Sequence, residues 1–210
     1  TASVWIQTVL AAFHRETITN EKQPVMGVER NPKTSDCLLA GANPFCRPQD
    51  FRTVLLELTT RCNLHCPVCY LAEQQKDLSC DEIRKVLSSL KGKGIMLTGG
   101  EPTLHPELDR IVGMVRQSRN RPFLVTNGIR LADSGYTRAL RRAGLKHVLL
   151  SFNGFDDEVY QRINGAPLLK DKMRALDVLK RNGMQVSLSF LLVPGVNESQ
   201  VGPVLEYAIK

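Results

Sequence analysis

The chain has 210 residues, of which 42% are hydrophobic, and a formal net charge of +7. A chain of this length can bury a core of its own, and no stretch approaches the roughly 20 apolar residues of a membrane-spanning helix, so we expect a cytoplasmic protein that does not span a membrane. Six cysteines are too few for a secreted disulfide scaffold of this size, which favours a reducing compartment.

The positive charge alone does not identify a partner. Basic residues such as Arg119, Arg141 and Lys146 fall at the ends or on the polar faces of expected helices, where positive charge suits the helix dipole. No aromatic residues are interleaved with them, so we expect no nucleic-acid partner. A basic surface can still steer an acidic protein or an anionic substrate toward the chain.

The N-terminal quarter of the chain differs from the rest. Apolar residues at helical spacing near the start predict a stripe that covers a neighbouring surface; they are Trp5, Ile6, Val9, Leu10 and Phe13. The stretch 31–48 contains prolines and glycines and predicts an irregular segment. We therefore divide the chain into an N-terminal extension, 1–52, and a core domain, 53–210.

Strand-like and helix-like segments alternate from residue 54 onward. The expected strands are 54–60, 95–98, 123–126, 147–152 and 185–193. Ser79 and Glu82 form a capping box that starts the first expected helix, whose apolar face carries Ile83, Val86, Leu87 and Leu90. A second helix starts at Pro106, others end near Gly144 and Gly183, and a last one begins near Glu198. Apolar strands that each precede a helix predict an α/β fold with a parallel sheet and right-handed crossovers.

Unusual residues follow each expected strand. In chain order they are Cys62, Cys66 and Cys69, then Gly99-Gly100-Glu101-Pro102, Asn127-Gly128, Asn153-Gly154, and Pro194-Gly195-Val196-Asn197. Active sites of parallel sheets and barrels lie at the carboxyl ends of the strands. We therefore expect these five loops to converge on one site.

The cysteine spacing, C-x-x-x-C-x-x-C, narrows the chemistry of that site. Three thiolates so placed can surround one four-iron cluster and leave one iron open to an exchangeable ligand. The alternative that the residues leave open is a noncatalytic module, in which His65 or Cys46 completes a zinc site or a cluster for structure or electron transfer. The Gly-Gly-Glu-Pro turn favours the first interpretation, because a structural site does not need an amine-binding turn.

The cysteine motif and Gly99-Gly100-Glu101-Pro102, one β/α unit apart, strongly resemble the radical S-adenosylmethionine (SAM) superfamily over roughly 51–210. The resemblance implies a partial (β/α)6 TIM-like barrel, so this chain, which stops within the helix after the fifth strand, looks truncated. It also implies a [4Fe-4S] cluster on Cys62, Cys66 and Cys69 that binds SAM. Reductive cleavage of SAM would then release a 5′-deoxyadenosyl radical that abstracts hydrogen from a substrate.

The resemblance also assigns the contacts of SAM. They comprise Gly100 and Glu101 at the amino group, Thr126 and Ser151 at the carboxylate or ribose, and Ser189 and Val193 along the adenine. Gly99, Pro102 and Asn153 are further expected cofactor-binding residues. We expect the glycines to let the backbone approach the ligand. We also expect apolar walls that keep water from the radical, formed by Leu56, Leu97, Val125 and Leu150.

Substrate and partners are less closely defined. Val68 stands where the family usually has an aromatic residue, and the segments 66–70, 104–106 and 151–156 are similar to a branch that includes tetraether-lipid synthases and pterin-methylating enzymes. Molybdenum-cofactor cyclases and peptide-modifying enzymes share much of this pattern, so lipid, pterin and peptide substrates remain open. The resemblance further implies a flavodoxin or ferredoxin as electron donor, and Cys37, Cys46 and Cys80 as candidate ligands of an auxiliary cluster.

Overall fold

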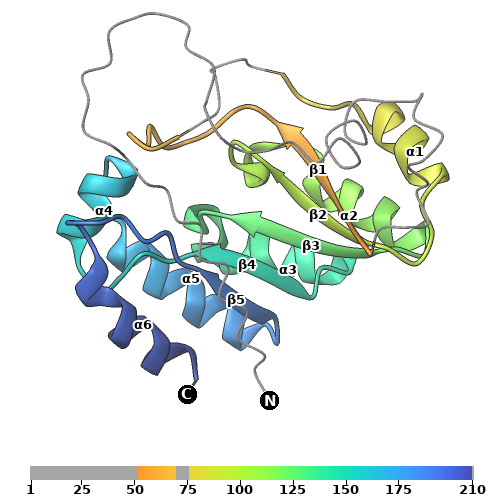
Figure 1. Ribbon diagram of the computed structural model, residues 1–210. Coiled ribbons are helices and arrows are strands. Elements are labelled where there is room, and N and C mark those ends of the chain that lie inside the picture. Colours follow the sequence, from red (N-terminus) through yellow and green to blue (C-terminus); the bar gives the residue numbers. More distant parts are fainter. Residues whose placement is uncertain (1–51, 70–75, 210) are drawn as a thin grey trace, which may run out of the picture. The chain divides into compact units, whose positions relative to one another are not determined.

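The computed structural model describes residues 52–69 and 76–209, and all structural statements below concern these residues. They form one sheet of five parallel strands in the order β1-β2-β3-β4-β5 (Figure 1). The strands are β1 (Thr53–Thr59), β2 (Gly94–Gly99), β3 (Arg121–Thr126), β4 (His147–Ser151) and β5 (Gln185–Ser189). The expected α/β fold with an open parallel sheet is confirmed. The expected N-terminal helix and Cys37 and Cys46 lie outside the described residues.

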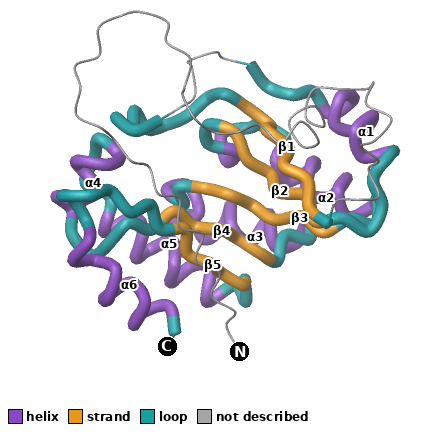
Figure 2. The backbone as a smooth tube through the Cα atoms, in the orientation of Figure 1, coloured by secondary structure: helices purple, strands orange, loops and turns teal. Residues whose placement is uncertain are grey.

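Helices follow every strand along the chain (Figure 2). They are α1 (Cys80–Ser88), α2 (Leu108–Gln117), α3 (Ser134–Ala143), α4 (Asp157–Asn164), α5 (Leu169–Arg181) and α6 (Val201–Ala208). Short 3-10 turns, η3 (Pro102–Leu104), η4 (Ile129–Ala132) and η5 (Glu198–Gln200), lie in the loops that follow β2, β3 and β5. Within the described part of the chain, no helix is both long and apolar enough to cross a bilayer.

The two faces of the sheet differ because side chains alternate along each strand. Leu56, Leu97 and Leu150 are 7%, 0% and 0% exposed and belong to the core between sheet and helices. Val125 points the other way and is half-buried on the open face. The expected apolar walls are therefore wrong for the three leucines, since their strand positions direct them toward the helices.

The first helix begins as expected. The Ser79 hydroxyl accepts a hydrogen bond from the Glu82 backbone amide at 3.3 Å, and Glu82 Oε2 accepts one from the Ser79 amide at 2.8 Å. Val86, however, is 40% exposed. The buried stripe runs through Cys80, Ile83, Leu87 and Leu90, and Val86 lies on its border.

Cys80 therefore belongs to the core. Burial raises the pKa of its thiol, and a hydrogen bond with Glu107 raises it further. The side chain does not line the cavity described below.

Two differences from the expected elements lie near the end of the chain. β5 ends at Ser189 rather than at residue 193, because side chains take over the backbone hydrogen bonds beyond it: Asn153 Oδ1 accepts from the Leu191 amide at 3.1 Å, and Asn197 Oδ1 from the Val193 amide at 2.8 Å. Helix α4, which was not expected, is inserted between β4 and α5. The Asp156 carboxylate caps its first turn, and Gly165 ends it with a φ of 78°.

Candidate active site

A cavity of about 480 Å³ lies at the carboxyl edge of the sheet, a volume typical of small-molecule sites. Most of the expected site residues line it, namely Cys62, Cys66, Cys69, Gly99, Gly100, Glu101, Thr126, Ser151 and Ser189. Pro102, Asn153 and Val193 do not line it. His65, which the sequence offered only as a ligand in the noncatalytic alternative, also lines it. Further lining residues were not assigned a role from sequence: Thr60, Leu64, Thr98, Asn127 and Asn164.

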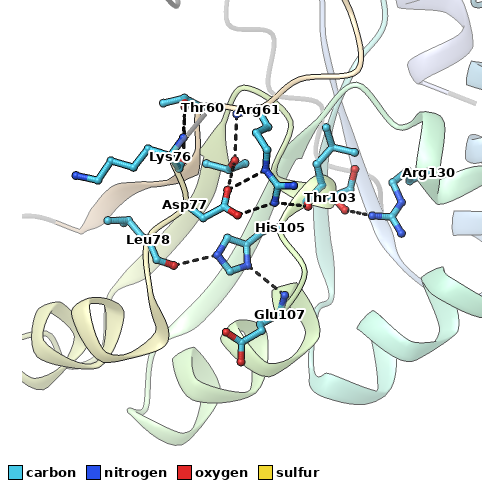
Figure 3. Close-up of polar contacts among 11 residues, drawn as sticks. Thr60, Arg61, Lys76, Asp77, Leu78, Thr103, His105, Glu107 and Arg130 are labelled. Carbon is cyan, nitrogen blue, oxygen red and sulfur yellow. Dashed lines mark hydrogen bonds and ion pairs between the residues drawn. The ribbon is translucent and has the colours of Figure 1, made fainter. Parts of the chain in front are cut away.

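The cysteine loop is closed at its base by an ion pair. The guanidinium of Arg61 donates to both carboxylate oxygens of Asp77, at 3.1 and 2.6 Å, and to the Leu104 carbonyl at 2.9 Å (Figure 3). The Thr59 hydroxyl donates to Asp77 Oδ1 at 2.6 Å, and the Thr60 amide donates to the Lys76 carbonyl at 3.0 Å. The residues on either side of the loop are thus joined by side-chain and backbone contacts.

His105 links the segment before α1 to the segment that leads into α2. Its Nδ1 accepts from the Glu107 amide at 3.2 Å, so its Nε2 carries the proton and donates to the Leu78 carbonyl at 2.9 Å (Figure 3). The ring is 3% exposed and does not line the cavity. His105 therefore anchors the chain that leaves the Gly-Gly-Glu-Pro turn.

Backbone hydrogen bonds join the two sequence motifs directly. The Gly100 amide donates to the Thr59 carbonyl and the Glu101 amide to the Arg61 carbonyl, both at 2.8 Å. A Cβ on Gly99 would lie 2.1 Å from the Thr59 carbonyl oxygen, and one on Gly100 would lie 2.4 Å from that of Arg61. The structure therefore requires both glycines for close packing against the end of β1, a reason distinct from the expected approach of a ligand.

Glu101 is 1% exposed, and its carboxylate is fully engaged within the protein. Oε1 accepts from the Thr103 amide at 3.0 Å, the Thr103 hydroxyl at 2.6 Å and the Thr126 hydroxyl at 2.7 Å. Oε2 accepts from the Asn127 amide at 2.7 Å. The carboxylate therefore ties the turn after β2 to the end of β3.

Three hydroxyl groups face the cavity from the open side of the sheet. Ser151 and Ser189 are paired across β4 and β5 and so project side by side. Thr98, at the end of β2, lines the same cavity. Its position one residue after buried Leu97 places it on the open face, so the strand alternation could have identified it from sequence.

Asn164, the last residue of α4, reaches the cysteine loop. Its Nδ2 donates to Cys66 Sγ at 3.4 Å, and its Oδ1 accepts from Asn153 Nδ2 at 3.2 Å. Asn153 is 2% exposed and therefore supports Asn164 from behind the cavity. A hydrogen bond to a cysteine sulfur tunes the properties of a metal that the sulfur binds.

The three cysteines form a donor set that suits an iron–sulfur cluster, because their side chains lie on one loop and line one cavity. Burial among its neighbours raises the pKa of the Cys62 thiol, so a cluster bound there would have to displace a proton from it. No group of three or more His, Cys, Asp or Glu side chains in residues 52–69 and 76–209 is gathered closely enough to hold a single metal ion.

Known proteins resemble the chain in sequence. The family model described as the Radical SAM superfamily matches residues 56–208. The chain is 31% identical over 164 residues to 7,8-dihydro-6-hydroxymethylpterin dimethyltransferase of Methanocaldococcus jannaschii, covering 73% of this chain and 32% of that protein. It is also 31% identical over 172 residues to GTP 3′,8-cyclase of Staphylococcus saprophyticus, covering 74% and 50%. The chain thus spans about a third to a half of the length of these relatives.

Solved structures share the fold. Streptococcus suis SuiB bound to S-adenosylmethionine matches with a TM-score of 0.62 at 14% identity, covering 75% of this chain and 36% of SuiB. Methylornithine synthase (PylB) matches with a TM-score of 0.62 at 18% identity, covering 74% and 50%. These structures share the fold of this chain, and the family match over most of its length shows that the chain belongs to the radical SAM superfamily.

Proposed function

We propose that this chain forms the SAM-cleaving core of its enzyme, with a [4Fe-4S] cluster on Cys62, Cys66 and Cys69 and SAM in the cavity beside it. The observation that carries the proposal is the direct backbone bond between Glu101 and Arg61, which joins the Gly-Gly-Glu-Pro turn to the residue before Cys62. When bound, cluster and SAM would supply a 5′-deoxyadenosyl radical for hydrogen abstraction. The protein residues bind, orient and shield the reactants.

The cavity offers suitable partners for the polar groups of SAM. Thr98, Ser151 and Ser189 present hydroxyl groups that can donate to a carboxylate and accept from a ribose. The Glu101 carboxylate already accepts four hydrogen bonds, so its proposed role is to hold the turn whose carbonyls receive the amino group. Val125 supplies an apolar wall on the open face.

The substrate is proposed only as a class. The similar proteins named above are a pterin dimethyltransferase and a GTP cyclase, and a third relative is PqqA peptide cyclase of Streptomyces rochei, 31% identical over 163 residues, covering 74% of this chain and 44% of that protein. Because the names of these relatives point to different substrates, the matched region supports the radical-forming step rather than one particular substrate. We propose hydrogen abstraction from a small molecule, lipid or peptide, with electrons from a flavodoxin or ferredoxin that docks on the basic surface.

Anaerobic reconstitution of the full-length protein tests the cluster and SAM cleavage together. We expect about four iron atoms per chain, bleaching with dithionite, and 5′-deoxyadenosine released from SAM. Cys66→Ala should lose the iron, whereas Cys80→Ala, which changes a buried cysteine outside the cavity, should keep it. A colourless protein that binds zinc and leaves SAM intact would instead support the noncatalytic module.

A further inference from the structure

Lys172 on α5 is a buried cation that none of the proposed roles uses. Its side chain is 0% exposed. The ammonium group donates to the Asn127 carbonyl at 2.6 Å and to the Ser151 carbonyl at 2.7 Å. Burying a charge is costly unless it is hydrogen-bonded, so this position calls for an explanation.

The two carbonyl groups lie where β3 and β4 part. The last registered pair of these strands is Thr126 and Leu150, so Asn127 and Ser151 each follow it by one residue. No further residue pair of these two described strands is in register beyond Thr126 and Leu150, and the ammonium contacts both segments there. Asn127 and Ser151 both line the cavity. The two hydrogen bonds of Lys172 therefore set the distance between these two parts of the cavity wall.

The other groups around the Lys172 ammonium are compatible with its charged form. Its nitrogen lies 5.7 Å from the centre of the Tyr160 ring, a favourable contact for a cation. Burial lowers the pKa of Lys172 to about 8, while Glu101, Cys66 and Asp171 act in the opposite direction. At pH 7 the group is therefore mostly protonated.

The charge balance of the cavity indicates a role for the Lys172 ammonium. Among the described residues, those that line the cavity include Glu101 and three cysteines but no lysine or arginine. Cluster binding converts the cysteines to thiolates, and reduction of the cluster adds a further electron. Negative charge therefore accumulates at a site whose nearby buried positive charge is Lys172, and net charge is one of the factors that set the potential of an iron–sulfur cluster.

We propose that Lys172 is a positioning residue that clamps the ends of β3 and β4 and, through its charge, stabilises the reduced form of the cluster. This inference rests on the proposed function. A purely structural clamp would affect stability alone, so the midpoint potential separates the two roles.

The test compares four forms of the full-length protein after anaerobic reconstitution: wild type, Lys172→Met, Lys172→Arg and Lys170→Met. Lys170 lies on the same helix and is exposed, so its replacement removes one charge without touching the clamp. Redox titration followed by electron paramagnetic resonance gives the midpoint potential, and iron content and the melting temperature are recorded for each form. The affinity of the oxidised proteins for SAM reports whether the distance between Asn127 and Ser151 in the cavity wall has changed.

Lys172→Met should reduce the ratio of reduced to oxidised cluster by about tenfold at a fixed potential, a negative shift of about 59 mV for a one-electron couple. Lys172→Arg retains the charge and should shift much less, and Lys170→Met should match wild type. If Lys172→Met takes up no iron, Lys172→Gln replaces it, because an amide keeps a donor for one carbonyl without the charge.

An iron-loaded Lys172→Met or Lys172→Gln protein with the wild-type potential would overturn the inference while leaving the proposed function intact. A wild-type protein that binds no cluster would contradict the proposed function itself.

Discussion

Arg61 and Asp77 form a two-pronged ion pair that joins the residue before Cys62 to the segment after the cysteine motif. Partial burial raises the pKa of the Asp77 carboxyl, but hydrogen bonds from Thr59 and Arg61 outweigh that effect and leave its pKa below the usual value. The carboxylate form is thus favoured in the folded protein, and the pair holds the base of the loop that carries the proposed ligands.

Asp77→Asn should loosen that loop. We expect the free energy of unfolding to fall by about 1 kcal/mol or less, since the pair is partly exposed and screened, and we expect iron to leave the reconstituted protein faster. Asp177→Asn is the matched control, because it breaks an exposed ion pair with Arg181 on α5. The measurement is the rate of iron release to a chelator. Equal rates in the two variants would show that the Arg61–Asp77 ion pair does not hold the cluster loop.

The pH dependence of stability gives a second test of Asp77. A lowered folded pKa contributes stability above the unfolded pKa of about 3.9, and this contribution is lost as the pH falls through the folded value. Melting temperatures measured from pH 6 down to pH 3 should therefore fall less steeply for Asp77→Asn than for wild type. Parallel curves would contradict the lowered pKa.

Gly100→Ala should disturb the cysteine loop as well as the SAM site, because its Cβ would lie 2.4 Å from the Arg61 carbonyl oxygen. Overpacking of this kind costs about 1–3 kcal/mol, and we expect both lower iron content and a lower melting temperature. Gly113→Ala in α2 serves as the control, since a Cβ there meets nothing within 4 Å. If Gly100→Ala binds iron fully and only its SAM binding is impaired, the role of Gly100 is to let the backbone approach SAM and not to pack against Arg61.

Glu101→Gln retains the shape of the side chain but replaces one acceptor oxygen by a donor. One of the four inward hydrogen bonds must then be lost, which costs about 1–3 kcal/mol when the group is buried. We expect weaker SAM binding with the cluster retained, read from the SAM-induced change in the spectrum of the reduced cluster. Glu206→Gln on exposed α6 provides the control, and unaltered SAM affinity in Glu101→Gln would exclude a role of the carboxylate in holding the turn.

Asn164→Ala removes the hydrogen bond to Cys66 Sγ without changing the charge of the protein. We expect the ratio of reduced to oxidised cluster at a fixed potential to fall roughly two- to tenfold, the range expected for one hydrogen bond. Asn182→Ala at the end of α5 removes an amide that donates only to the Val178 carbonyl and should leave the potential unchanged. Identical midpoint potentials for the three proteins would indicate that the contact with sulfur has no influence on a bound cluster.

Much of this architecture can be predicted from residue order alone. Alternating apolar segments predict the parallel sheet, and the common direction of its strands brings Cys62, Gly100, Thr126, Ser151 and Ser189 to one edge. These predictions succeed because they depend on local periodicity and on strand direction. The fifth strand begins at Gln185 as predicted, but its predicted end at residue 193 is wrong. Apolar periodicity does not reveal that Asn153 and Asn197 take the backbone bonds beyond Ser189.

The sequence by itself therefore determined the family motifs, the class of fold and the edge at which the loops meet. Only the tertiary structure decided how those loops are held: Asp77 against Arg61, Asn164 against Cys66 across 98 residues of chain, and Lys172 beneath the parted ends of β3 and β4. The physical reason is that a buried polar group must find its hydrogen-bond partner in space. In these contacts the partner lies 16 to 98 residues away along the chain, and no local pattern of residues specifies it.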